Sequence, residues 1–300
     1  MTLVILLNLA PTTTSFAGPA TYFLWCGNST TDYWDAASAW TSDATGDAYV
    51  DPVYGPIGPP DTPNKTLQII FQGDTSELCY CDVNTWEFGT LQMNSTPIQV
   101  GYSPTDKTDG AALMLYGDGI INYSATGALI TLTTHGSLEF FNSSTAGDIS
   151  INSSSADQTN TYIKFHDSST AGSTTFTVGI NSYVLFSNSA SAGNATLTTA
   201  GTNTSLQFSD TSTAGNATLG AIGAEGAGFN AGTYVGFSGS AHGGTATITA
   251  QNGGLVTFND SSSADHATIT SLSYYSYRSV WKTSLINPRC RAKLGGVTCP

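Results

Sequence analysis

The sequence predicts an all-β chain wound into a parallel β-helix (a β-solenoid), and three observations lead to this fold class. A twelve-residue frame, seen at 208–219 as FSDTSTAGNATL, occurs six times, beginning at Phe140, Phe165, Phe186, Phe208, Phe237 and Phe258. The frame returns every 21 to 29 residues, a period typical of solenoids in which each repeat forms one coil. On both sides of its corner, apolar and polar residues alternate, as they do in strands with one buried face.

Each repeat reads as a strand, a corner and a second strand. In the first strand, Leu206 and Phe208 flank Gln207, so we expect the two apolar side chains to point inward and Gln207 outward. The corner carries short hydroxyl and carboxamide side chains and a Gly, which suit turns and positive φ. Asn252-Gly253-Gly254 marks a further corner. An antiparallel sandwich would explain the alternation but not the faithful repetition of the corner sequence.

Charge is scarce and uneven along the chain. Charged residues make up 10% of the composition, and residues 1–277 hold 21 acidic residues against three basic ones, a formal charge of −18. Binding to nucleic acid or to anionic lipid depends on clustered Lys and Arg. We therefore expect no nucleic-acid partner, and the composition is typical of secreted proteins.

The first seventeen residues have the pattern of a secretory signal peptide. Thr2 to Ala10 is an apolar run too short to span a bilayer. Ser15-Phe16-Ala17 gives a small-x-small pattern suited to cleavage before Gly18. No Lys or Arg precedes the apolar run, and we therefore expect the true start to precede Met1. The competing interpretation of this segment is a buried N-terminal strand. No other stretch is long and apolar enough for a transmembrane helix.

Residues 18–110 form an aromatic-rich head. Trp25, the step from Trp34-Asp35 to Trp40, the turn Pro60-Asp61-Thr62 and the apolar strand 67–71 follow one another in order. This order resembles the start of autotransporter passenger domains, and the STAGNAT-type corners resemble the repeats of such passengers. The resemblance spans residues 21–270 and implies a right-handed β-helix, exported and displayed at or shed from the outer membrane of a Gram-negative bacterium.

The resemblance also implies a C-terminal membrane β-barrel, and no pattern of that kind follows residue 270. We therefore expect a fragment, a broken gene or a passenger-like module exported by another route. Residues 111–270 are assigned to the β-helix and 271–300 to an atypical tail, whose five basic residues and lack of acids reverse the charge of the body. The tail is either a cap over the last coil or the product of a frame change; the frame change is favoured.

The head aromatics have two interpretations. Trp34, Trp40 and Trp86 would cover the open end of the first coil as a hydrophobic cap, which is the favoured interpretation. Alternatively, Trp25 and Trp34 would form a platform on which carbohydrate stacks.

No metal site, cofactor site or catalytic site is predicted. The five cysteines, Cys26, Cys79, Cys81, Cys290 and Cys299, lack zinc-site spacing, although Cys26 could bridge to Cys79 or Cys81 in an exported protein. Hydrolase, nucleotide and metalloprotease motifs are missing. The pairs His166-Asp167 and Asp265-His266 are interpreted as solvated turn residues. A β-helix polysaccharide lyase or hydrolase is the enzymatic alternative, using Glu225 in the 220–235 insertion.

Threonines recur as Thr-x-Thr steps at the start of the second strand. The steps begin at Thr131, Thr175, Thr196, Thr247 and Thr268. Stacked coils would align them into two parallel columns, similar to the ice-binding faces of some β-solenoid antifreeze proteins; the simpler interpretation is that β-branched Thr suits an exposed sheet. Overall the sequence predicts a non-catalytic, structural or adhesive surface protein whose partners are host or matrix glycans or proteins.

Overall fold

The fold is known from a computed structural model. It describes backbone and side chains of residues 85–93, 97–101, 111–124, 127–155, 159–223 and 232–271, and the backbone alone of strands at 21–26, 40–41, 62–71, 79–81, 291–293 and 296–298 and of residue 272. Every described element is a β-strand. The repeats form a parallel β-solenoid of about six turns, so the predicted fold class is confirmed; the right-handed sense stays a prediction.

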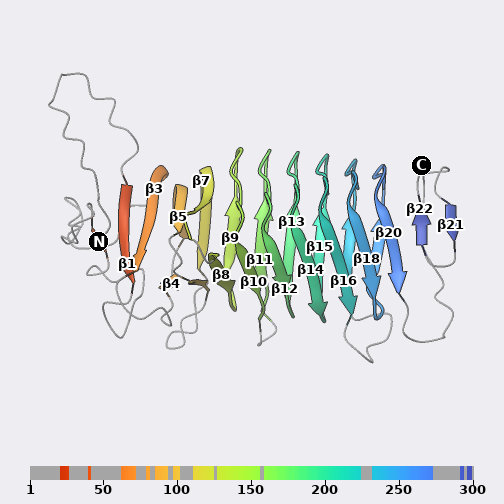
Figure 1. The fold of residues 1–300 in the computed structure, drawn as a ribbon, viewed down its shortest axis with the longest axis horizontal. Helices are drawn as coiled ribbons and strands as arrows, with labels where there is room; N and C mark the ends of the chain where they lie inside the picture. The colour runs from red at the N-terminus through yellow and green to blue at the C-terminus, as the bar shows by residue number, and fades with distance from the viewer. Residues whose placement is uncertain are drawn as a thin grey trace, which may run out of the picture.

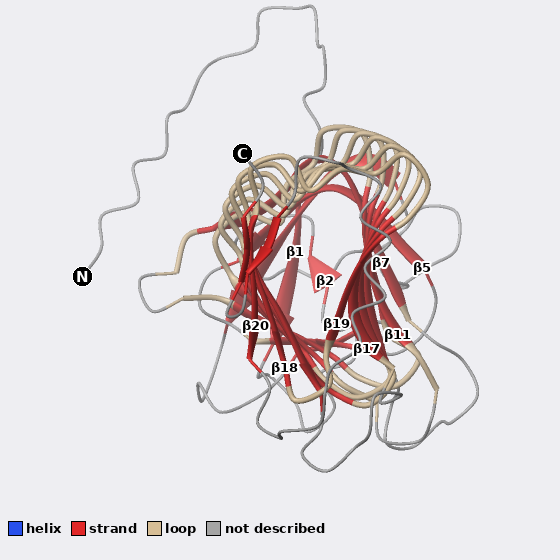
Figure 2. Cartoon of the chain, turned by 90° about the vertical axis from the view of Figure 1, so that its right-hand side faces the viewer, coloured by secondary structure: helices blue, strands red, loops and turns tan. Residues whose placement is uncertain are grey.

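Two long sheets run side by side along the solenoid (Figures 1 and 2). The first, sheet A, contains eleven strands: β1 (Thr21–Cys26), β2 (Trp40–Thr41), β3 (Thr62–Phe71), β5 (Thr85–Met93), β7 (Ala112–Asn122), β9 (Ser137–Phe140), β11 (Thr161–Phe165), β13 (Ser182–Phe186), β15 (Thr204–Phe208), β17 (Thr233–Phe237) and β19 (Leu255–Phe258).

Sheet B also contains eleven strands. They are β4 (Cys79–Cys81), β6 (Ile98–Val100), β8 (Leu129–Leu132), β10 (Ser150–Ser153), β12 (Thr175–Val178), β14 (Thr196–Gly201), β16 (Thr218–Gly223), β18 (Thr247–Gln251), β20 (Thr268–Leu272), β21 (Arg291–Lys293) and β22 (Gly296–Thr298). From β3 to β20, successive strands alternate between the two sheets, so β13 in sheet A is followed by β14 in sheet B and then by β15 in sheet A. Within this stretch, neighbouring strands in each sheet therefore come from successive coils and are parallel. The pairs that involve β2, β21 and β22 are antiparallel.

A third, shorter ladder joins the coils at their corners. Isolated parallel bridges connect Gly119, Thr145, Thr170, Ser191, Thr213, His242 and Ser263. Each coil therefore has three sides: a sheet A strand ending in Phe, the bridge residue and a sheet B strand.

A column of six phenylalanine rings forms the centre of the core. Phe140, Phe165, Phe186, Phe208, Phe237 and Phe258 stack with centroids 4.6 to 4.8 Å apart and nearly parallel planes. This spacing matches the separation of neighbouring strands, about 4.8 Å. Leu206 and Phe208 are buried and Gln207 is half-buried on the other face, which confirms the predicted strand phase.

The corner that directly follows each sheet A strand, called the first corner from here on, is held by a ladder of Asn and Asp residues in the left-handed conformation. Asn142, Asp167, Asn188, Asp210 and Asp260 have φ between 54° and 58°. Most of these side chains accept a hydrogen bond from a backbone N–H one coil earlier, as when Asp167 Oδ2 accepts from Asn142 N at 2.9 Å and Asp210 Oδ2 from Asn188 N at 2.8 Å. Gly239 takes this corner position in its coil, as the turn composition predicts.

The irregular spacing of the repeats arises at the third corner, between sheet B and the next sheet A strand. The 25-residue and 29-residue coils nonetheless keep β10–β12 and β16–β18 in register. Their extra residues therefore lie after β10 and after β16, and they leave both sheets continuous.

The two ends of the described chain extend these sheets. The parallel ladder of sheet A continues from β7 through β5 and β3 to β1, across the predicted boundary at residue 110. At the other end, β22 pairs antiparallel with β20. That pairing is the arrangement expected if the tail covers the last coil. The signal segment 1–17 and tail residues 273–290 lie outside the described residues.

We predict that Phe208→Asp destabilises the solenoid far more than Gln207→Asp. The first change places an unpaired charge inside the phenylalanine column, whereas the second loses at most one side-chain hydrogen bond, worth about 1 kcal/mol. Phe208→Ala, expected to cost about 3–5 kcal/mol, gives a measurable value if the Asp variant does not fold. Urea unfolding followed by circular dichroism is the measurement, and equal losses at positions 207 and 208 would contradict the strand phase.

Candidate functional site

The outer face of sheet A carries the tyrosines of the described repeats and a cluster of three ionisable side chains, Glu139, Lys164 and His166. Three columns of residues run along it, separated by the inward-pointing ones. In chain order across β9 to β17, they are Ser137, Tyr162, Tyr183, Ser205 and Tyr234; Glu139, Lys164, Leu185, Gln207 and Gly236; and, just after each strand, Phe141, His166, Ser187, Ser209 and Ser238.

An ionic cluster lies at the N-terminal end of this face. Lys164 Nζ donates to Glu139 Oε1 at 2.7 Å, Ser137 Oγ donates to the same oxygen at 2.8 Å, and His166 Nε2 lies 3.3 Å from Glu139 Oε2. The Glu139 side chain is only 10% exposed, compared with 29% for Lys164 and for His166. The carboxylate is therefore covered by its own partners, and Lys164 lies on the outward face of β11, between the buried Ile163 and Phe165.

These contacts keep the Glu139 carboxyl ionised. Burial alone would raise its pKa, but the hydrogen bonds from His166, Lys164 and Ser137, with the charge of Lys164, outweigh burial and lower the pKa to about 2. A general acid must hold its proton near the working pH. Glu139 cannot do so, and the cluster has the geometry of a structural ion pair that joins two coils.

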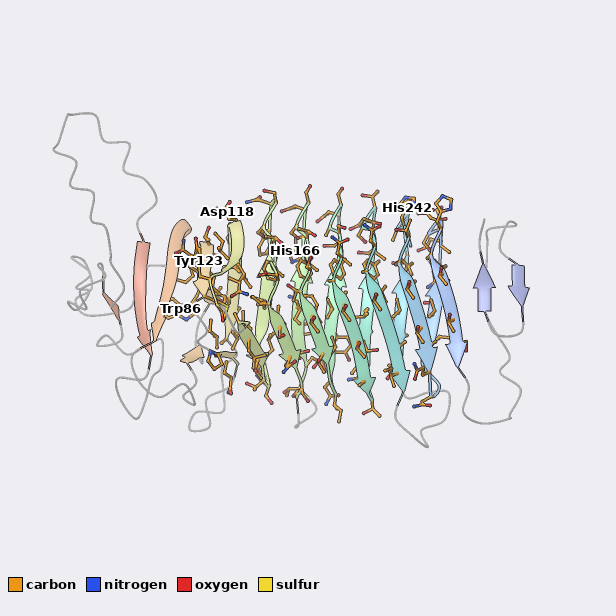
Figure 3. All side chains as sticks on the ribbon, in the orientation of Figure 1. Trp86, Asp118, Tyr123, His166 and His242 are labelled. Carbon is orange, nitrogen blue, oxygen red and sulfur yellow. The ribbon has the colours of Figure 1, made fainter. Side chains whose placement is uncertain are left out.

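An aromatic stack adjoins the cluster. Tyr116, Phe141 and His166 lie one above another, with centroids 4.7 and 4.6 Å apart and interplanar angles of 9° and 12°. In Figure 3, which also draws the coils before β9, His166 lies near the middle of the row of coils. The prediction that His166 is a solvated turn residue is therefore wrong, because an aromatic ring and a carboxylate one coil earlier both contact its imidazole.

Tyrosines form the column at the opposite edge of the face. The rings of Tyr162 and Tyr183 stack at 5.5 Å. Asparagine side chains fix both hydroxyls: Tyr183 Oη donates to Asn203 Oδ1 at 2.6 Å, and Asn160 Nδ2 donates to Tyr162 Oη at 3.1 Å. Because burial raises the pKa of Tyr183, its hydroxyl stays neutral at physiological pH.

The other face of the solenoid, on sheet B, presents the threonine columns. Thr175, Thr196, Thr218, Thr247 and Thr268 pair in unbroken register and are all exposed. The second column contains Thr131, Asn152, Thr177, Thr198, Gly220, Thr249 and Thr270. The predicted columns thus exist, with one difference: Thr131 aligns with the second column, and Leu129 begins the first.

A second His–carboxylate pair occupies the third ladder. His242 Nδ1 lies 3.1 Å from Asp265 Oδ2 in the next coil, with the two side chains 49% and 31% exposed. Figure 3 shows His242 at the corner end of its coil, apart from His166. Asp265 was predicted to be a solvated turn residue; it lies at a turn with φ of 49° but is paired with His242.

Several predicted features cannot be placed. Glu225, on which the enzymatic alternative depends, and Trp34 lie outside the described residues, and the side chains of Trp25, Trp40 and the five cysteines are likewise outside them. Trp86 is buried, as a cap residue would be. Within the described ranges, no group of three or more His, Cys, Asp or Glu could hold a metal ion, and no helix suited to crossing a membrane occurs.

Comparison with known proteins adds no assignment. No family model, no curated protein and no solved structure matches the chain.

The low pKa of Glu139 predicts acid sensitivity of this end of the solenoid. A carboxyl whose pKa falls on folding stabilises the fold above its unfolded pKa, near 4.5, and this stabilisation is lost as pH falls toward 2. We expect wild type to exceed Glu139→Gln in stability at pH 7 by on the order of 3 kcal/mol, and the difference to shrink between pH 4.5 and 2. Urea unfolding at several pH values measures it.

Lys164→Gln is the matched control, because it removes the cation and should weaken the same pH dependence. A difference between wild type and Glu139→Gln that stayed constant from pH 7 to pH 2 would show that ionisation of Glu139 does not stabilise the fold.

Proposed function

We propose that this chain is an exported, passenger-like surface protein of a Gram-negative bacterium that acts by display and adhesion, without catalysis. The solenoid fold agrees with a passenger-like architecture, and the signal-like start supports export. The observation that carries the adhesive function is the outer face of sheet A, where ordered aromatic rings are half-exposed on a rigid scaffold. Aromatic side chains held in place offer contact area at low entropic cost.

The geometry favours adhesion over the enzymatic alternative. The described carboxylates nearest to a base are Glu139, beside Lys164 and His166, and Asp265, beside His242. Glu139 is ionised and covered by its partners, so it can neither donate a proton nor contact a substrate directly. A lyase or hydrolase would therefore need Glu225 or another group outside the described residues.

Adhesion is tested with beads coated with the full chain and washed over cultured epithelial cells and over immobilised extracellular matrix. We expect wild-type beads to be retained, and Tyr162→Ala/Tyr183→Ala beads to be retained several-fold less because they lose two fixed rings. Tyr123→Ala is the matched control. Tyr123 is 60% exposed, but it follows β7, beyond the bridge at Gly119 and away from the outer face of sheet A. Retention of wild-type beads no better than of albumin-coated beads would reject the proposal.

A second candidate function, ice binding, is favoured by one observation on sheet B. The nine threonines of the two columns between β12 and β20 form no side-chain hydrogen bonds with other described residues, so their hydroxyls are free to bind water. Coils about 4.8 Å apart and alternate residues about 6.7 Å apart arrange them as a regular lattice. Both long coils keep the lattice in register.

Gly220→Thr tests this candidate. It would fill the gap in the second column, and a Cβ at Gly220 meets Thr198 only at 3.5 Å, an ordinary contact. We expect the variant to increase thermal hysteresis and Thr218→Lys to abolish it. Thr211→Lys, at the exposed first corner, is the control. Freezing of wild type and Gly220→Thr indistinguishable from an equal mass of albumin would remove ice binding.

A further inference from the structure

The tyrosine column of sheet A has a gap that is covered rather than open. Tyr183 and Tyr234 pair in register with Ser205, which lies between them in the coil of β15. Ser205 is on the outer face and yet is 0% exposed. Its small side chain must therefore be roofed by its larger neighbours, and one of them, Gln207, donates from Nε2 to Ser205 Oγ at 2.8 Å.

The ring of Tyr234 leans over the backbone of its own strand. A Cβ built on Gly236 would lie 3.1 Å from Tyr234 Cε2 and 3.2 Å from Cδ2, and Gly236 is buried although it faces outward. Gly236 thus makes room for the ring. Gly236 lets Tyr234 lie low on its strand, and Tyr183 stacks on Tyr162 on the other side of the small Ser205. These half-exposed rings form a platform.

This platform is uncharged in an acidic protein. The outward residues of β13, β15, β17 and β19 are Tyr183, Leu185, Ser205, Gln207, Tyr234, Gly236, Leu255 and Thr257, none of which ionises at neutral pH. The nearest charged groups in the columns are Lys164 and Glu139, which neutralise each other. A ligand held here gains nothing from charge, and an anionic ligand is repelled by the rest of the molecule.

The exposed apolar area is small for a protein partner. Tyr162, Tyr183 and Tyr234 are half-buried and Leu255 is 47% exposed, so together they offer at most about 350 Å². A stable protein–protein interface buries about 800 Å² per partner. A second copy of the chain is therefore a poorer fit than a narrow ligand lying along the column.

We propose that Tyr183 and Tyr234, with Gln207 beside them, bind a neutral glycan that runs along the solenoid axis. Pyranose rings would stack on the tyrosine faces, and their hydroxyls would bond to Gln207 Oε1, which accepts no hydrogen bond from a described residue, and to the tyrosine hydroxyls. The fixed hydroxyl of Tyr183 and the seat provided by Gly236 prepare the platform before binding. This inference rests on the proposed adhesive function and names its ligand class.

The test is calorimetric titration of the full chain with cellohexaose and mannohexaose as neutral probes and hexagalacturonate as the acidic one. We expect at least one neutral probe to bind and the acidic probe not to bind. Tyr183→Ala and Tyr234→Ala should each weaken binding about tenfold. Tyr183→Phe, which keeps the ring but loses the hydroxyl bonded to Asn203, should weaken binding less than Tyr183→Ala. Tyr123→Ala, which changes an exposed residue elsewhere, should change affinity less than twofold.

Other outcomes overturn the inference. If neither neutral hexasaccharide binds at millimolar concentration while coated beads still adhere to cells, the glycan inference fails and adhesion stands. If the beads do not adhere either, the proposed function fails as well. If sedimentation shows self-association that Tyr183→Ala abolishes, the platform is an interface between copies. Equal losses in Tyr183→Ala and Tyr123→Ala would show that the platform is not the binding site.

Discussion

The structure depends on one constraint: coils stacked in parallel register bring each side chain against its equivalents in the coils before and after it. Because neighbouring coils are about 4.8 Å apart, identical side chains in one column must attract one another or at least not repel one another. Phenylalanine satisfies this condition by ring stacking, as the column from Phe140 to Phe258 shows. Asparagine satisfies it with hydrogen bonds between coils, as Asn216 does with Asn194 and Asn203 with Asn181.

The same constraint explains why the repeats contain so few charges and where those charges occur. Two equal charges in one column would lie within 5 Å of each other and repel. Glu139 is instead followed by Lys164 in its column, and His242 pairs with Asp265. At the first corner, Asn142, Asp167, Asn188 and Asp210 alternate amide with carboxylate, and each acid accepts a backbone N–H from the preceding coil. Charge is tolerated where the neighbouring coil compensates it.

Much of this fold could be predicted from the sequence because the constraint repeats. Aligning the chain on its phenylalanines was enough to predict that Phe208 is buried, that Gln207 faces outward and that the threonines form two columns. The alignment failed for Thr131, which precedes the first full frame. The two ends could not be predicted because they lack the repeat: the pairing of β22 with β20 leaves no trace in the spacing of residues.

The candidate site was missed for a different reason. Glu139 precedes Lys164 by 25 residues and His166 by 27, and local motif searches do not join residues so far apart. The signal was nevertheless present: Glu139 and Lys164 each precede a core phenylalanine, and His166 follows one. Reading the residues before and after each phenylalanine as columns would have shown the ion pair, the aromatic stack and the uncharged stretch from Leu185 to Thr257. Tyr234 leaning over Gly236 could not have been read this way, since it depends on a rotamer.

The position of the insertions determines which surfaces can vary. Both long coils gain their extra residues at the third corner, so neither insertion displaces a strand of sheet A or sheet B. Flat arrays on the two sheets can therefore persist over many coils while the third corner changes in length. This separates a regular geometry from a variable one. The sheets carry ladders that depend on regular spacing, and the third corner gains residues while the strands on both sides keep their register.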